Sequence, residues 1–238
     1  MKTILVSTIV RNRNKFLSMW QRQLSELCKL KPDYKFYLSV FENDSIDGSE
    51  ATLKSLNYEG FKDVHVNCKT LNTPAFGSIK NDLRVRLLAE ARNTSIYENP
   101  FLDGCDYVLS VEPDIEYSPA EMIKIIDNEH YDILSARSIE YIPPAPNHLY
   151  DGWGTRNTEK HLDWEPIVEF KGLIDTWTTY NCFCRYNATA IKDRISFSGF
   201  NDRLGIPDCD TAVICENFRS SGFNKIGLQG NCNVLHKR

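Results

Sequence analysis

The sequence predicts an α/β fold in which a parallel sheet is flanked by helices. Three observations predict it: an N-terminal run of β-branched and aliphatic residues at Lys2–Val10, a helical apolar stripe directly after it, and a continued alternation of strand and helix patterns up to residue 111. The chain has 238 residues, of which 42% are hydrophobic. It can therefore bury a large core, and we expect one domain.

The elements of the first half follow one another in a regular order. The run Lys2–Val10 has no helical stripe and indicates a buried first strand. Apolar residues at three- and four-residue spacing then predict a helix; they are Phe16, Leu17, Trp20, Leu24 and Leu27. The same criteria predict strands at Tyr34–Phe41, Asp63–Cys68 and Tyr107–Val111, a short helix around Leu53 and Leu56, and a helix at Lys80–Tyr97.

The second half is less regular. Ser118-Pro-Ala-Glu121 has the pattern of a capping box, with proline at the first helical position, and predicts a helix from there. Beyond Asp132 we expect loops and mixed strands. A last helix is expected from about Asp210 to Ser221, ending on Gly222, before a final strand that ends near His236. We expect residues 1–117 to form the donor half and 118–238 the acceptor-side half of the single domain.

Charge and composition exclude several classes of protein. The formal net charge of −4, from 28 Lys+Arg and 32 Asp+Glu, offers no basic surface for nucleic acid. The apolar run Ile4–Val10 is too short for a signal sequence or a membrane span, so we expect a cytoplasmic protein. The eight cysteines are expected to be reduced, buried thiols.

Polar clusters follow two of the predicted strands. In open parallel sheets, ligands bind beyond the carboxyl ends of the strands. The segment Thr8–Asn14, which includes Val10, offers Arg11 and Arg13 to a base or pyrophosphate. The segment Glu42-Asn43-Asp44 offers carboxylates to a ribose or a base edge. For each cluster taken alone, the alternative remains open: a solvated turn for the first, helix capping for the second.

Glu112-Pro113-Asp114 is the most specific signal in the chain. Two carboxylates stand one residue apart at the end of an apolar strand, where they can hold Mg²⁺ or Mn²⁺ against a nucleoside diphosphate leaving group. An isolated triplet of this kind is usually a solvated loop, but its position favours the metal site. His236, at the end of the last predicted strand, is a third candidate ligand.

Taken together, these segments resemble the GT-A glycosyltransferases, and more closely the fungal capsule-associated α-1,3-mannosyltransferase family. The resemblance implies a GT-A type, Rossmann-like mixed sheet flanked by helices. It is carried by Phe41–Gly48, Ala91–Asn93, Tyr107–Ile115, Tyr131-Asp132, Tyr150–Trp153, Trp177–Cys182 and Asp208–Gly222. The sequence departs from the family pattern in having Glu-Pro-Asp in place of a strict Asp-x-Asp.

The resemblance also implies roles for single residues. Asp114 would be the principal metal ligand with Glu112 beside it, and Arg92 would help to order the donor. Glu42, Asn43 and Asp44 would lie near the nucleoside. The sugar or acceptor side would be lined by Asp151, Trp153, Trp177, Asn181, Asp208 and Asp210. Asp151, Asp208 and Asp210 are the candidate catalytic carboxylates, and helix capping is the alternative for the last two.

The function that follows is metal-dependent transfer of a hexose or deoxyhexose, with retention, from a GDP- or UDP-linked donor to a hydroxyl of a glycan or glycoconjugate. A catalytically silent sugar-binding module is an alternative, because Trp153, Trp164 and Trp177 could stack on sugars. A sugar nucleotidyltransferase is a weaker one, since Arg11–Asn14 stands where its Gly-rich phosphate loop is expected.

Overall fold

The computed structural model describes residues 1–77, 79–142, 145–159 and 171–237. Most of its strands form one mixed sheet, in the order β3-β2-β1-β4-β9-β6-β12-β5, with β7 beside β6 and β8 beside β12. The strands are β1 (Thr3–Val10), β2 (Lys35–Asn43), β3 (Asp63–Lys69), β4 (Tyr107–Val111), β5 (Ile115–Tyr117), β6 (Ile133–Ile142), β7 (Ala145–Leu149), β8 (Leu173–Asp175), β9 (Phe183–Asn187) and β12 (Ile226–His236). A separate pair is formed by β10 (Phe200–Asn201) and β11 (Ile206–Pro207).

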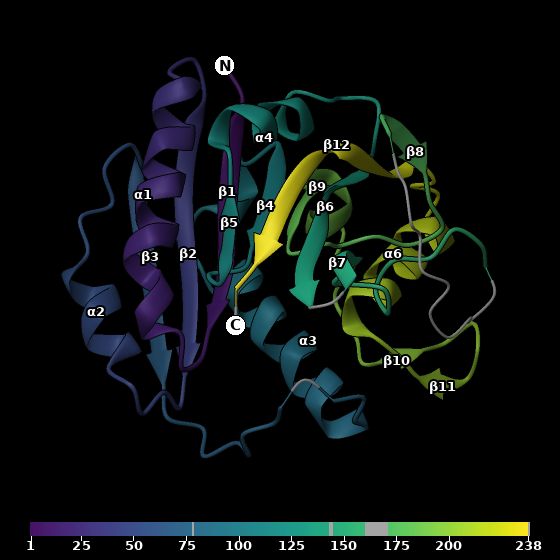
Figure 1. Cartoon of the computed structure of the whole chain (residues 1–238), viewed down its shortest axis with the longest axis horizontal. Helices are drawn as coiled ribbons and strands as arrows, with labels where there is room; N and C mark the ends of the chain where they lie inside the picture. Colours follow the sequence, from purple (N-terminus) through teal and green to yellow (C-terminus); the bar gives the residue numbers. More distant parts are fainter. Residues whose placement is uncertain (78, 143–144, 160–170, 238) are drawn as a thin grey trace.

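Helices cover both faces of this sheet (Figure 1). They are α1 (Asn14–Leu30), α2 (Ser49–Ser55), α3 (Asp82–Tyr97), α4 (Pro119–Ile126), α5 (Ala188–Lys192) and α6 (Asp210–Ser220), with one 3₁₀ turn at Leu102–Gly104. Within β1, Ile4 and Val6 pack with α1, α2 and α4, whereas Leu5 packs with α3, α5 and α6. Alternate residues of a strand point to opposite faces, so one apolar run supplies two core layers.

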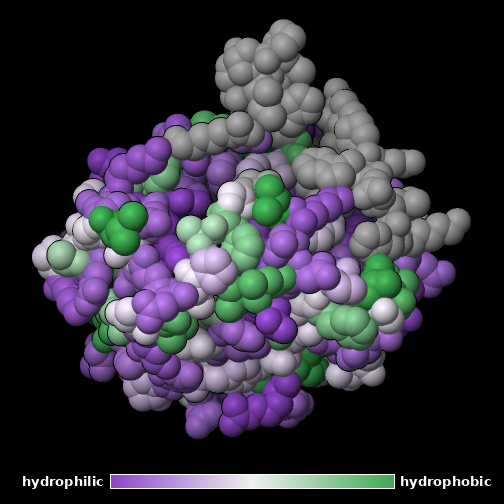
Figure 2. Space-filling model, turned by 90° about the horizontal axis from the view of Figure 1, so that it is seen from below, coloured by the Kyte–Doolittle hydropathy of each residue, from purple (hydrophilic) through white to green (hydrophobic). Residues whose placement is uncertain are grey.

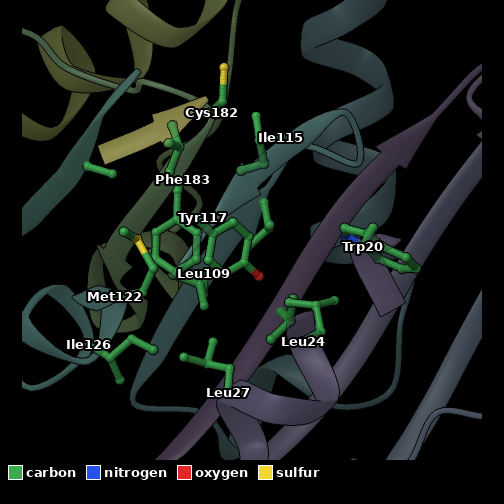
Figure 3. Packing of buried hydrophobic residues seen from close by; sticks show 14 of the residues in the cluster. Trp20, Leu24, Leu27, Leu109, Ile115, Tyr117, Met122, Ile126, Cys182 and Phe183 are labelled. Atoms are coloured by element: carbon green, nitrogen blue, oxygen red, sulfur yellow. The ribbon is translucent and has the colours of Figure 1, made fainter. Parts of the chain in front are cut away.

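Figure 3 shows the first of these layers. Trp20 and Leu24 of α1 lie across from the strand residues Leu109 and Tyr117, and Met122 of α4 closes the cluster. All but Tyr117 are at most 1% exposed. The large apolar area removed from water here fixes α1 and α4 against the sheet.

The register of the parallel strands brings their carboxyl ends to one edge. Val10 pairs with Glu42, and Glu42 pairs with Cys68. At the other side of the sheet, His236 of β12 pairs with Ile115 of β5. The ends of β1 and β12 therefore both point toward the lower side of the molecule in Figure 1.

The predicted elements of the first half are confirmed. Some of their ends differ from the prediction by a few residues, because hydrogen bonds of capping side chains determine where a helix begins. Helix α3 begins at Asp82, because the side chain of Asn81 caps it by accepting from the backbone N–H of Arg84 (3.0 Å). Helix α4 begins as predicted, but the capping box is wrong: Ser118 makes no side-chain cap, and its backbone carbonyl accepts from Glu121 and Met122.

The second half is mixed, as expected. Helix α6 ends at Ser220, and Gly222 adopts φ +92°, the left-handed conformation that favours glycine after a helix. All eight cysteines are free thiols, seven of them buried. In the described part of the chain, no helix is long and apolar enough to cross a membrane.

Candidate donor-binding and catalytic site

A cavity of about 400 Å³ opens at the carboxyl ends of β1 and β2. Its walls come from these strand ends, the segment 69–76 and helix α3. Of the residues predicted to bind the donor, Val10, Arg11, Asn43 and Glu112 line it. Figure 2 views the molecule from this side, where hydrophobic and hydrophilic side chains alternate over the surface. The lining combines apolar side chains with polar and basic ones, which suits a base and its phosphates.

Asp44 holds one wall of the cavity in place. Its carboxylate accepts from the backbone N–H groups of Leu71, Asn72 and Thr73 at 2.7–3.0 Å and from the Thr73 hydroxyl at 2.6 Å. Burial opposes its charge, but these bonds outweigh burial and lower the pKa of Asp44. Arg11 donates to Thr73 and to the carbonyl of Pro74. Both residues were predicted to touch the donor, and both position segment 71–74.

We expect Asp44→Asn to weaken nucleotide binding about tenfold, because one amide oxygen cannot accept from four donors, and the wall loosens. Isothermal titration with GDP and UDP measures this, with Asp63→Asn, an exposed aspartate at the far end of β3, as the control. Because the pKa of Asp44 lies well below its ordinary value of about 4, the carboxylate stays ionised in the folded protein even at pH 4, and the wild-type wall holds across neutral pH. Unchanged affinity in Asp44→Asn would show that the wall does not depend on this carboxylate.

Two predicted donor ligands are engaged elsewhere. The Thr8 hydroxyl donates to the carbonyl of Val111 (2.9 Å) and links β1 to β4. Glu42 is 2% exposed and accepts from the backbone N–H of Ser45 (2.8 Å). Neither is among the residues that line the cavity.

Asp114 and His236 meet at the edge of the cavity region. Because β5 pairs with β12, the imidazole Nε2 lies 3.5 Å from Asp114 Oδ2, and the same oxygen accepts from Arg13 Nε at 2.7 Å. Burial raises the pKa of Asp114, but His236 and Arg13 more than offset it, so that the pKa lies below its ordinary value. The ring of Tyr150 stacks on His236 with centroids 3.6 Å apart.

Glu112 does not join this pair. Its Oε1 accepts from Arg92 (2.7 Å) and from the hydroxyl of Tyr180 (2.6 Å). Among the described residues there is no group of three His, Cys, Asp or Glu side chains that could hold a metal. The three-ligand set of Asp114, Glu112 and His236 is therefore not assembled: the buried guanidinium of Arg92 attracts Glu112 away.

Arg92 is the centre of a buried polar network. Besides Glu112, it donates to Asp210 (2.9 Å) and to Tyr180 (2.5 Å). Burial disfavours the charge of Arg92, yet Tyr180, Glu112 and Asp210 raise its pKa above the ordinary value. Burial also raises the pKa of Asp210, and Arg92 offsets this only in part.

Asp151 is placed by a second network. Its Oδ2 accepts from the backbone N–H of Asn181 (3.0 Å). Asn181 is fully buried, and its amide bonds to Ser135, Thr155 and Ser138, so it orients Asp151 and is shielded from any sugar. Burial and the charge of Asp210 raise the pKa of Asp151 to about 6.

Asp208 is held differently. It is fully buried and forms a two-bond ion pair with Arg156 at 2.9 and 2.6 Å, while Asn201 donates to Oδ2. Arg156 and Asn201 outweigh burial and lower its pKa. The capping alternative for Asp208 and Asp210 is not supported, because the N-cap of α6 is Cys209 and no side chain caps the helix there.

The tryptophans differ in accessibility. Trp177 donates to Glu216, and its ring contacts the guanidinium groups of Arg219 and Arg203, so it is already engaged within the protein. Trp153 is partly buried, with the Lys80 ammonium 5.5 Å from its ring centroid. Trp164 lies outside the described residues.

Sequence reasoning missed several residues of the site. Lys69, Thr73, Arg84 and Leu87 line the cavity, and Tyr180 bridges Arg92 and Glu112. Tyr180 lies inside the stretch Trp177–Cys182 that carries the family resemblance, but the others follow no motif. The contribution of Lys69 and Thr73 depends on the path of segment 69–76, and that of Arg84 and Leu87 on how α3 lies against the sheet, and only the fold reveals either.

Solved structures similar to this one show which fold it has. The S. aureus protein TarS, residues 1–349, solved with UDP-GlcNAc, matches with TM-score 0.57 and 13% identity over 100% of this chain and 59% of that chain. The mannosyltransferase PcManGT from Pyrobaculum calidifontis, solved with GDP-Man and Mn²⁺, matches with TM-score 0.57 and 8% identity over 99% and 56%. This chain thus spans less than two thirds of either.

Sequence comparison identifies the family. No curated protein matches the sequence significantly. The family model described as Cryptococcal mannosyltransferase 1 matches residues 3–183, which is most of the chain. Both the predicted GT-A fold and the predicted family resemblance are confirmed. The chain belongs to the Cryptococcal mannosyltransferase 1 family of glycosyltransferases.

Proposed function

We propose that the protein transfers a hexose or deoxyhexose, with retention and with the help of Mn²⁺ or Mg²⁺, from a GDP- or UDP-linked donor to a glycan hydroxyl. The observation that carries this proposal is the cavity at the carboxyl ends of β1 and β2, close to the pair Asp114 and His236. TarS was solved with UDP-GlcNAc, and PcManGT with GDP-Man and Mn²⁺. Residues 1–117 form the donor half of one domain and residues 118–238 its acceptor-side half.

Asp114 and His236 have the chemistry of a metal site. Two ligands that each lie about 2.1 Å from a metal are separated by about 3 to 3.5 Å, and the two side chains face each other at 3.5 Å. The ring of Tyr150 stacks on the imidazole of His236 and restricts its orientation. When bound, a divalent ion neutralises the charge that develops on the diphosphate leaving group.

The chain's own side chains then have distinct tasks. The cavity holds the nucleoside, and Arg13, which lines it, binds a phosphate. Arg92 fixes Glu112 and Tyr180 behind the sugar site. Retention needs either a carboxylate nucleophile or attack on the same face as the leaving phosphate. We assign the carboxylate near the sugar to Asp151 or Asp210; Asp208, held by Arg156, has a structural role.

We expect the rate of transfer to rise with pH through about pH 6, because only ionised Asp151 can stabilise positive charge on the sugar. Asp151→Asn should remove this limb of the pH–rate profile and slow transfer at pH 8 by about tenfold or more. Asp202→Asn, which changes an exposed aspartate, is the control.

The thermal stability of Asp151→Asn shows whether a loss of activity comes from the missing carboxylate or from a damaged fold. A raised pKa means that folded Asp151 binds its proton more tightly than the unfolded chain, so its contribution to the free energy of unfolding falls as pH rises from about 4 to about 6. Asp151→Asn should therefore unfold at the same or a higher temperature than wild type at pH 8. An unchanged pH limb in the variant would remove Asp151 from the mechanism.

Donor hydrolysis tests the proposed function. The purified chain is incubated with Mn²⁺ and a panel of GDP-, UDP- and TDP-sugars, and release of the nucleoside diphosphate is followed. Metal-dependent release from one donor is expected. Glycan binding without any release would favour the sugar-binding module, and pyrophosphate release from a nucleoside triphosphate and a sugar phosphate would favour a nucleotidyltransferase.

A further inference from the structure

Arg13 stands between the cavity and the carboxylate of Asp114. Its main chain is fixed, since its backbone N–H donates to Ser49 (3.0 Å) and that of Asn14, the first residue of α1, donates to Asp47 (2.9 Å). Its side chain is 43% exposed and lines the cavity, while its Nε bonds to Asp114. A turn of the guanidinium toward the cavity would break its bonds to Asp114 and to the carbonyl of Asn12 (3.2 Å), but it would require no movement of the helix.

One carboxylate oxygen of Asp114, Oδ2, has a basic side chain on each of two sides. Oδ2 accepts from Arg13 at 2.7 Å and faces His236 Nε2 at 3.5 Å. A divalent cation bound between Asp114 and His236 needs the lone pairs of this oxygen. It would also bring two positive charges within a few ångströms of the guanidinium, and the like charges repel. The Arg13–Asp114 bond and a metal on Oδ2 therefore weaken each other.

A nucleoside diphosphate offers Arg13 another partner. Its phosphates attract a guanidinium as strongly as a carboxylate does, through paired N–H···O bonds. Arg13 lines the cavity, and so does Pro113, the residue directly before Asp114. Turning toward the cavity would let Arg13 bind phosphate and would free Asp114 in the same movement.

We propose that Arg13 is an internal counter-ion that keeps divalent cations off Asp114 until a nucleoside diphosphate draws it away. The inference rests on the proposed metal site. It makes Arg13 a positioning residue that couples the two ligands: metal alone binds weakly, and metal and nucleotide strengthen each other's binding. A purely structural Arg13, which only links α1 to the segment after β4, would give no such coupling.

Titration of Mn²⁺ followed by the electron paramagnetic resonance signal of the free ion tests this, with and without GDP or UDP. In Arg13→Gln, Mn²⁺ alone should bind about tenfold more tightly than in wild type, and the gain in Mn²⁺ affinity on adding nucleotide should shrink by a similar factor. Arg13→Lys keeps the positive charge but loses the paired N–H donors of the guanidinium. Its affinity for Mn²⁺ should lie between those of wild type and Arg13→Gln. Lys15→Gln removes an exposed charge from the same turn of α1 and should match wild type.

The outcomes separate this inference from the proposed metal site. If Asp114→Asn binds Mn²⁺ as wild type does, the metal site itself is wrong. If Asp114→Asn loses Mn²⁺ binding while Arg13→Gln binds it no more tightly than wild type, the site stands and the counter-ion role is overturned. Equal tightening in Arg13→Gln and Lys15→Gln would reduce the effect to general surface charge and would also overturn it. Thermal unfolding of each variant checks that the fold is kept.

Discussion

Asp114→Asn should slow transfer about 100- to 1000-fold at saturating donor. A metal contributes several kcal/mol to the stabilisation of the leaving group, and each 1.4 kcal/mol is about a factor of ten in rate. Asparagine keeps the shape of the side chain, but its neutral amide is a poor ligand for Mn²⁺ or Mg²⁺. The initial rate of nucleoside diphosphate release, measured over a range of Mn²⁺ concentrations, gives the size of the effect.

Glu116→Gln is the matched control for this experiment. Glu116 is an exposed carboxylate two residues away, on β5, and pairs with Lys237. It should keep wild-type activity. Turnover close to normal in Asp114→Asn would refute the metal assignment, and an equal loss in both variants would attribute the effect to damage of β5.

Arg92→Met should lower the free energy of unfolding by about 3–5 kcal/mol, because it leaves the carboxylates of Glu112 and Asp210 without their buried partner. Denaturation by urea at pH 7 measures this loss. Arg86→Gln, which removes an exposed arginine from the same helix, should change stability by less than about 0.5 kcal/mol.

A double variant shows whether charge or packing is responsible. Arg92→Met combined with Asp210→Asn removes one of the stranded charges and should recover part of the stability lost in Arg92→Met. If the double variant is less stable by the simple sum of both changes, the network is not electrostatically coupled. Transfer should fall in all variants at Arg92, since Glu112 and Tyr180 lose their orientation.

Local patterns predicted much of the fold. The run Thr3–Val10 and the strand Tyr107–Val111 bury nearly every residue, and such continuous apolar runs mark central parallel strands. The position of β9 could not be predicted in the same way. It lies antiparallel between β4 and β6, and its partners are far away in the sequence: Tyr107 of β4 pairs with Asn187, and Ile133 of β6 pairs with Tyr186. No periodicity within Phe183–Asn187 encodes its partners.

The site was predicted in part. Strand ends predicted that Asn43 and Arg11 lie together, and both line the cavity, while the last strand brings His236 to Asp114. The sequence could not show which charged side chains form ion pairs with each other. Glu112 points to Arg92, and Asp208 to Arg156, because buried charges pair with whichever opposite charge the tertiary fold supplies. A sequence shows which side chains carry charge, but not which of them are neutralised.

The position of β12 at the end of the chain bears on the order in which the site is completed during synthesis. The strands that frame the donor cavity lie early in the chain, whereas His236 lies at the end of β12, which pairs with β5, β6 and β8. A nascent chain that extends only to β5 contains the parallel strands β1 to β4 and Asp114, but not yet His236. If the proposed metal site is right, catalysis requires β12 to dock, because only its pairing with β5 brings His236 to Asp114.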